Sequence, residues 1–168
     1  MTTIRLAGPE DFEFFYQLKC EDSNIFWTGH DRAPDYDGLK NFFDNILSHQ
    51  SEDNVRKIYI IMDENIPVGQ IYLNPEPPHP SGVRVLDIPC AVSEKHWGKG
   101  YAKQAIQLAF DEAKRLGSHK LRGSIREDNL ASMRAYIACG AKVLDEYKNV
   151  FIPGVGQEVK MFIVEKDL

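Results

Sequence analysis

Apolar and polar positions along the chain follow two periods, which together predict a fold of mixed strands and helices. Alternating or continuous apolar stretches predict strands over residues 4–6, 55–62, 66–73, 83–92, 120–125, 141–147 and 158–164. Apolar residues at helical spacing predict four helices, over residues 9–19, 39–47, 102–113 and 131–139. The elements therefore follow in the order β-α-α-β-β-β-α-β-α-β-β, with about seven strands and about four helices.

The fourth predicted strand, residues 83–92, contains Pro89. Proline lacks the backbone N–H that a regular ladder needs, so we expect a bulge or a local splay of the strand at this position. The segment 75–82 before it contains four prolines and is expected to be an irregular connector. The segment 21–34, which is rich in Asp, Asn and Gly, is also expected to be irregular.

Composition and charge narrow the class of protein. The chain has 168 residues, of which 43% are hydrophobic and 27% are charged, and this profile predicts one globular domain over residues 1–168. The net charge of -5, with basic residues scattered among acidic ones, offers no face for nucleic acid. Because no apolar stretch resembles a secretory signal or a membrane span, we expect a cytoplasmic protein.

The residues that commonly bind metals show no metal-binding pattern. The three cysteines are far apart in sequence, and none belongs to a C-x-x-C pair. The five histidines have no metal-ligand spacing either. We therefore expect free thiols and no metal.

Gly98-Lys99-Gly100 follows an apolar strand directly and precedes an amphipathic helix. Two glycines alone often mark only a turn. In this context, however, consecutive backbone N–H groups and the helix dipole would converge on an anion, which predicts a phosphate site. A P-loop would need a longer glycine-rich loop that ends in Gly-Lys-Ser/Thr, whereas here Gly100 is followed by Tyr101, and the dinucleotide fingerprint would need glycine in place of Lys103.

Two segments carry a resemblance to a known family. Residues 92–102 resemble the acetyl-CoA motif of the GNAT superfamily of N-acetyltransferases, written Q/R-x-x-G-x-G/A. Gly100 and Ala102 occupy its small-residue positions, whereas Trp97 stands where the family usually has Gln or Arg. Residues 129–141 resemble the family's later pattern, N-x-x-[AS]-x-x-x-Y-x-x-x-G-[FA]. A nucleotide-binding domain that merely converges on Gly-x-Gly is an alternative interpretation.

The resemblance implies a GNAT-like α/β domain, with a central mixed, mostly antiparallel sheet that opens to admit acetyl-CoA as cosubstrate. It implies direct attack by an amine acceptor, without a covalent enzyme intermediate, so that Cys90 and Cys139 serve packing. A catalytically silent acyl-CoA-binding module is the alternative, and a homodimer is left open. The residues that the resemblance assigns to the cofactor are Cys90, Ala91, Val92, Trp97, Gly98, Lys99, Gly100, Tyr101, Ala102, Lys103, Asn129 and Tyr136.

The family also implies roles for individual side chains. Tyr136 matches the tyrosine that protonates the departing thiolate, although it could instead be an interfacial aromatic residue. Asn129 matches a residue that contacts the cofactor arm and could equally cap the following helix. Ser124 stands where some relatives carry a Glu that acts as the general base. Asp87 is therefore the candidate base, with a structural or solvated carboxylate as the alternative.

The acceptor amine is expected to contact the loop region over residues 22–37, and no individual residue there is assigned a role. Its aromatic and acidic side chains could form a wall that suits a cationic amine, although such loops are often only solvated. The side chains considered are Trp27, His30, Asp31, Asp35 and Tyr36.

Overall fold

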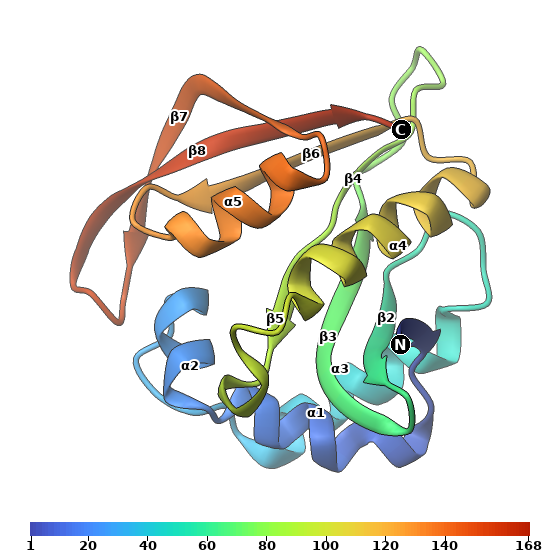
Figure 1. Cartoon of the computed structure of the whole chain (residues 1–168), viewed down its shortest axis with the longest axis vertical. Helices are drawn as coiled ribbons and strands as arrows, with labels where there is room; N and C mark the ends of the chain where they lie inside the picture. The colour runs from blue at the N-terminus through green and yellow to red at the C-terminus, as the bar shows by residue number, and fades with distance from the viewer.

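One eight-stranded sheet forms the centre of the molecule, and helices cover both of its faces (Figure 1). The computed structural model describes all of residues 1–168. Its strands are β1 (Thr2–Leu6), β2 (Lys57–Asp63), β3 (Ile66–Pro75), β4 (Val85–Asp87), β5 (Cys90–Val92), β6 (Lys120–Arg126), β7 (Lys142–Ile152) and β8 (Gln157–Asp167). Its helices are α1 (Phe12–Lys19), α2 (Asp22–Thr28), α3 (Tyr36–His49), α4 (Tyr101–Arg115) and α5 (Leu130–Ala138), with 3-10 turns η1 (Pro9–Asp11) and η2 (Glu94–His96).

The strand order is β1-β2-β3-β4-β6-β8-β7, and β5 pairs with β3 outside this path. All pairings are antiparallel except that of β4 with β6. The predicted mixed α/β class with a mostly antiparallel sheet is thus confirmed. The structure has eight strands and five α-helices, slightly more than the sequence predicts.

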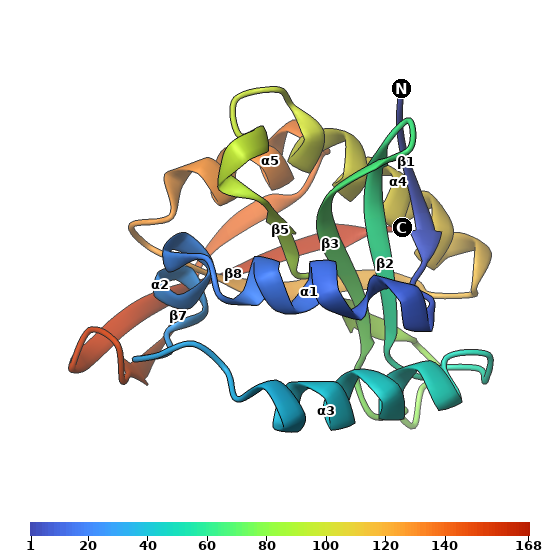
Figure 2. The same ribbon diagram turned by 90° about the horizontal axis from the view of Figure 1, so that it is seen from below.

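Two hydrophobic clusters hold the layers together. α4 packs with one face of the sheet through a stripe of buried residues, Ala105, Ile106, Ala109, Phe110 and Ala113. On the opposite face, Phe12 and Phe15 of α1 and Phe43 of α3 pack against β2 and β3. Figure 2 shows α1 and α3 on one side of the sheet and α4 and α5 on the other. None of the helices is both long enough and apolar enough to cross a bilayer.

Two expectations about individual elements need correction. The predicted strand over 83–92 is two strands, β4 and β5, separated at Ile88 and Pro89. The segment 21–34, expected to be irregular, contains α2, which ends at Gly29 in the left-handed conformation (φ 81°). Glycine adopts this conformation at little steric cost, so the helix stop was readable from the sequence. The contacts that support the rest of α2 come from distant residues.

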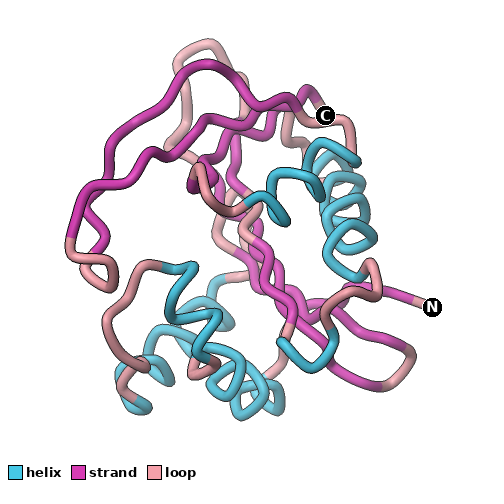
Figure 3. Tube along the Cα trace, turned by 60° about the vertical axis from the view of Figure 1, so that its left-hand side comes forward, coloured by secondary structure: helices cyan, strands magenta, loops and turns pink.

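The β7–β8 hairpin is longer than its two predicted strands, because its ladder extends from Lys142–Glu165 to Ile152–Gln157. Its turn reaches the segment that follows α2, where the Gly154 N–H donates to the Gly29 carbonyl at 3.2 Å. Figure 3 shows this approach of the hairpin turn to the N-terminal helices. The hairpin therefore closes one side of the molecule near α2.

Candidate active site

The sheet separates into two halves just beyond β4. β4 and β6 are paired at only two positions, Val85–Lys120 and Leu86–Leu121. After Pro89, β5 stays with β3, while β6 continues alongside β8. Pro89 cannot donate a hydrogen bond, and its carbonyl accepts from the Tyr72 N–H of β3 at 2.9 Å. The splay expected at Pro89 is therefore confirmed.

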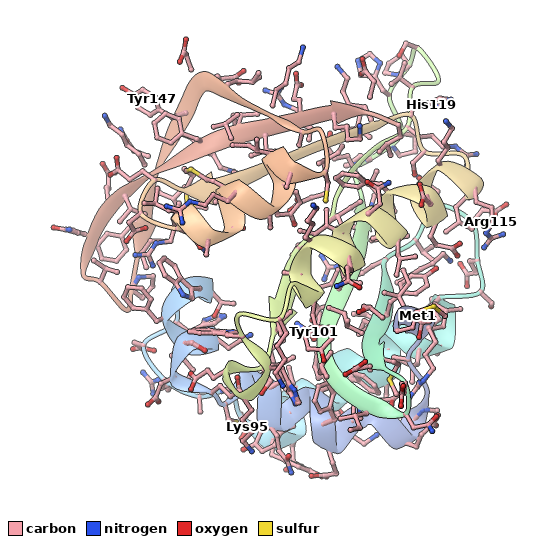
Figure 4. The ribbon with its side chains drawn as sticks, in the orientation of Figure 1. Met1, Lys95, Tyr101, Arg115, His119 and Tyr147 are labelled. Carbon is pink, nitrogen blue, oxygen red and sulfur yellow. The ribbon has the colours of Figure 1, made fainter.

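A cavity of about 770 Å³ fills the region between the separated strands. Its walls come from α2, β5, the loop before α4, the start of α4, β6 and α5. In Figure 4, Lys95 marks the loop before α4 and Tyr101 marks the first turn of that helix. A volume of this size suits a small-molecule ligand.

Two residues of the turn Gly98-Lys99-Gly100, called the glycine turn below, line this cavity. Gly98 (φ 77°) and Gly100 (φ 81°) are both in the left-handed region, and Gly100 is the N-cap residue of α4. A Cβ at Gly98 would meet nothing within 4 Å. Backbone N–H groups at a helix N-terminus favour anions, so this turn can hold a phosphate group.

Trp97 makes a contact that the motif comparison does not indicate. Its indole Nε1–H donates to the Val92 carbonyl of β5 at 2.8 Å, while 53% of the residue is exposed. The side chain thus ties the loop to the end of the splayed strand. A Gln or Arg at this position could donate a hydrogen bond as well, so the tryptophan keeps a donor at the site.

Most residues assigned to the cofactor line the cavity. These are Cys90, Ala91, Val92, Trp97, Gly98, Gly100, Tyr101, Ala102, Asn129 and Tyr136. Lys99 and Lys103 are not among the lining residues. Asn129 also caps α5, because its Oδ1 accepts from the Ser132 N–H at 3.2 Å.

Tyr136 lies on the wall of the cavity contributed by α5 and is buried. Its hydroxyl donates to the Ile88 carbonyl, in the segment where β4 and β5 separate. Burial raises the pKa of Tyr136 well above its ordinary value, and the nearby Cys90 and Asp87 raise it further. The phenol therefore keeps its proton at neutral pH.

Asp87 also lines the cavity, so the alternation of the strand does not turn it away from the site. Burial raises the pKa of Asp87 to about 6, against the opposing effect of the hydrogen bond from the Ile88 N–H to Oδ1 (2.8 Å). A carboxylate with a pKa near neutrality is suited to exchanging protons. A Cβ on Gly123 of β6 would overlap Asp87 Oδ1, so the absence of a side chain at Gly123 makes room for this carboxylate.

The expected acceptor wall is only partly present. Trp27 lines the cavity, as do Ser23, Asn24 and Thr28 of α2, but His30, Asp31, Asp35 and Tyr36 do not. Three of the latter make contacts elsewhere instead. Asp35 caps α3 by accepting from the Gly38 N–H, Asp31 pairs with Arg32, and the Tyr36 hydroxyl donates to Glu13.

Arg126 is a residue of this site that has no predicted role. Its side chain is 4% exposed and donates to both oxygens of Asp128, at 3.0 and 2.8 Å. Nη1 donates to the Phe26 carbonyl of α2 at 3.0 Å, and the guanidinium stacks on the rings of Phe26 and Trp27. An arginine two residues before an aspartate at the end of a strand was a readable sign of an ion pair, but its contact with α2 was not.

The cysteine thiols are free, and Cys90 and Cys139 have the properties of packing residues rather than of nucleophiles. Burial raises the pKa of Cys90 to about 12, and the Cys139 Sγ–H donates to the Lys103 carbonyl. A protonated thiol is a poor nucleophile. No group of three or more His, Cys, Asp or Glu side chains is placed to hold a metal ion.

Comparison with known proteins defines the class. The family model described as "Acetyltransferase (GNAT) domain" matches residues 2–142. The chain therefore belongs to this family, and the predicted class of acyl-CoA-dependent acetyltransferase is confirmed at that level. No curated protein matches the sequence.

Solved structures show the same fold at low identity. Spermidine N-acetyltransferase from Vibrio cholerae, in complex with CoA and spermine, has a TM-score of 0.82 and 18% identity over 99% of this chain and 95% of that one. Ribosomal-protein-alanine N-acetyltransferase from Brucella melitensis has a TM-score of 0.80 and 16% identity, with 99% of each chain covered. A GNAT superfamily phosphinothricin acetyltransferase from Sinorhizobium meliloti, in complex with acetyl-CoA, has a TM-score of 0.81 and 15% identity over 99% and 88%. Two of these three structures contain CoA or acetyl-CoA, in agreement with the expected cosubstrate.

The raised pKa of Asp87 predicts that ionisation of this carboxyl lowers the free energy of unfolding, so that stability depends on pH. The native state favours the protonated carboxyl, so the stability of the protein should fall as pH rises from about 4 through 6. Asp87→Asn should therefore raise the free energy of unfolding by about 2–3 kcal/mol at pH 7.5 and change it little at pH 4. Denaturant unfolding at both pH values measures the difference. Asp145→Asn, at an exposed position of β7, is the matched carboxylate-to-amide control, and an equal effect of Asp87→Asn at both pH values would contradict the assignment.

Proposed function

We propose that the protein transfers an acetyl group from acetyl-CoA to a primary amine of a small molecule or peptide, by direct attack within a ternary complex. The observation that carries this proposal is the shared cavity, whose walls include the glycine turn, Asp87 and Tyr136. Family membership supports the acetyl-CoA chemistry. The separated strands β5 and β6 leave backbone groups along which an extended pantetheine arm can pair.

The proposed cofactor site extends along the cavity from the glycine turn. The pyrophosphate would contact the backbone of Trp97 to Lys103, and the pantetheine arm would run beside Cys90, Ala91 and Val92. Asn129 would contact the arm through the part of its amide that is not engaged in capping α5. Lys99 and Lys103 would contribute only backbone N–H groups, because they do not line the cavity.

The proposed reaction assigns one proton step to each of two side chains. Asp87 accepts a proton from the acceptor ammonium, and the neutral amine attacks the thioester carbonyl. The carbon–sulfur bond of the tetrahedral intermediate then breaks, and Tyr136 donates its proton to the departing thiolate. The proton that the new amide nitrogen still carries passes to the Tyr136 phenolate, and Asp87 releases its proton to solvent, so both side chains return to their starting states. Because the thiols of Cys90 and Cys139 stay protonated, neither attacks the thioester, and the acetyl group passes directly to the amine.

The acceptor end of the cavity is built from polar and aromatic side chains of α2, together with Asp87, Asp128 and Met161. Three structural neighbours act on spermidine, on a ribosomal-protein alanine and on phosphinothricin, according to their names. These acceptors share an amine and little else. We therefore propose an amine acceptor and define it no further.

We also propose that the whole chain acts as one domain in the cytoplasm, where reducing conditions keep thiols such as its three free cysteines reduced.

If a homodimer forms, the open edge of β7 is the surface best suited to it. β7 pairs with β8 on one side only and exposes Tyr147 (49%) and Phe151 (59%). Such an edge can pair with a second chain.

The function is tested by binding and turnover. Calorimetry with acetyl-CoA, CoA and ATP should show heat for the CoA forms and little for ATP. Release of free CoA in the presence of spermidine, phosphinothricin and an alanine-starting peptide should then identify a productive amine. Preferential binding of ATP would contradict the proposal, and binding of acetyl-CoA without release in a broad amine panel would favour the silent binding module.

Tyr136→Phe should lower kcat by about 10²-fold or more, because the thiolate would leave without a general acid. Binding of CoA, measured by calorimetry, should change much less. Tyr59→Phe is the matched control, since the Tyr59 hydroxyl donates to Glu112 and lies outside the cavity. An equal loss of kcat in both variants would show that Tyr136 has only a structural role.

The pH–rate profile tests Asp87. At saturating acetyl-CoA, kcat/KM for the amine should fall as pH drops below about 6, because the protonated carboxyl cannot accept a proton. Asp87→Asn should lower kcat/KM by about 10²-fold and remove this acidic limb. An unchanged profile in Asp87→Asn would exclude Asp87 as the base.

A further inference from the structure

The segment before α2 and the loop that precedes α4 each contribute one glutamate, and each glutamate accepts hydrogen bonds from the other segment. Glu21 Oε1 accepts from the Ser93 hydroxyl at 2.5 Å, and its Oε2 accepts from the Glu94 N–H at 2.9 Å. In return, Glu94 Oε1 accepts from the Ser23 N–H at 2.9 Å. We call these four residues, Glu21, Ser23, Ser93 and Glu94, the carboxylate exchange.

Each glutamate of the carboxylate exchange provides the N-terminal cap that the other segment's helix lacks. The first N–H groups of a helix have no partner within the helix, and a side chain at the helix's own N-cap usually satisfies one of them. Neither α2 nor η2 has such a cap from its own N-cap residue. The caps come instead from a residue more than 70 positions away in the chain, and Ser93 is only 5% exposed. Each start is therefore held in place by the other.

The two segments contribute different parts of the wall of the same cavity. η2 leads into Trp97 and the glycine turn, whereas α2 provides Asn24 and Trp27. The far end of α2 is held separately by Arg126, through the Phe26 carbonyl. The carboxylate exchange is thus the direct polar link from the cofactor loop to α2.

We propose that Glu21 and Glu94 are positioning residues that couple the cofactor loop to α2, so that binding of CoA at the loop orders the acceptor wall. The proposal rests on the proposed function, because it assumes that CoA binds at the glycine turn. A ligand that fixes the loop also fixes the Glu94 carboxylate and the backbone N–H that Glu21 caps. By linkage, the acceptor affinity gained through CoA equals the CoA affinity gained through the acceptor.

The test uses CoA as the probe and the full-length chain. Calorimetry first measures CoA binding, and hydrogen exchange of the α2 amides is then compared with and without saturating CoA. In the wild type, CoA should slow exchange of the α2 amides by about fivefold or more, within the usual range of coupling between sites. In Glu94→Ala, CoA should still bind, but this protection of α2 should be lost.

The conservative variants separate positioning from simple burial of α2 under the ligand. Glu94 uses one oxygen as an acceptor, and Gln retains such an oxygen, so Glu94→Gln should restore most of the protection. Glu21 uses both oxygens, so Glu21→Gln should restore only part of it. Asp22→Ala removes the adjacent exposed carboxylate and should leave the coupling unchanged. If Glu94→Ala does not fold, Ser93→Ala removes a single hydroxyl of the carboxylate exchange and should reduce the protection.

The outcomes distinguish the two proposals. If wild-type protein gives no heat with CoA, both the proposed function and the coupling are overturned. If CoA binds and protects α2 equally in the wild type and in Glu94→Ala, the coupling is overturned while the proposed function stands. The same holds if CoA binds the wild type without protecting α2.

Discussion

The early end of the β4–β6 pairing is the constraint on which the rest of the structure depends. Two residue pairs join these strands, and beyond Leu86–Leu121 the two halves of the sheet follow different neighbours. Backbone groups at such a gap need other partners. The Ile88 carbonyl finds one in the Tyr136 hydroxyl, and the Ile88 N–H finds one in Asp87. The two side chains proposed for proton transfer are therefore also the side chains that satisfy the break in the sheet.

Burial gives these two side chains different proton chemistry at neutral pH. It raises the pKa of both, but Tyr136 starts high and so remains protonated, whereas Asp87 reaches only about 6 and can lose its proton. The pKa values of a phenol and a carboxyl are far apart to begin with, so after both rise the phenol is still the proton donor and the carboxylate still the proton acceptor of the pair. Gly123 contributes by leaving room for the carboxylate on the facing strand. The splayed sheet thus provides both the space for a substrate and the protonation states that the proposed reaction needs.

Features encoded by neighbouring residues could be predicted from the sequence, whereas long-range contacts could not. Pro89 indicated the splay, and the glycine turn indicated the start of α4, because each acts through its own backbone. α2 was missed because its start is capped by Glu94 and its end is held by Arg126. Asp35, considered for the acceptor wall, caps α3 through Gly38, a local contact that its position before a helix could have indicated.

The same long-range contacts determine which side chains are left to contact the proposed acceptor. Arg126 pairs with Asp128, and the carboxylates of Glu21 and Glu94 are occupied as helix caps, so these charges serve structure first. Asp87 is then the carboxylate at this end that the proposed mechanism leaves for the amine itself. The remaining wall of α2 presents an amide, hydroxyls and the ring of Trp27. Discrimination among amines would therefore depend on the shape of this wall, which in turn depends on how α2 is held at its two ends.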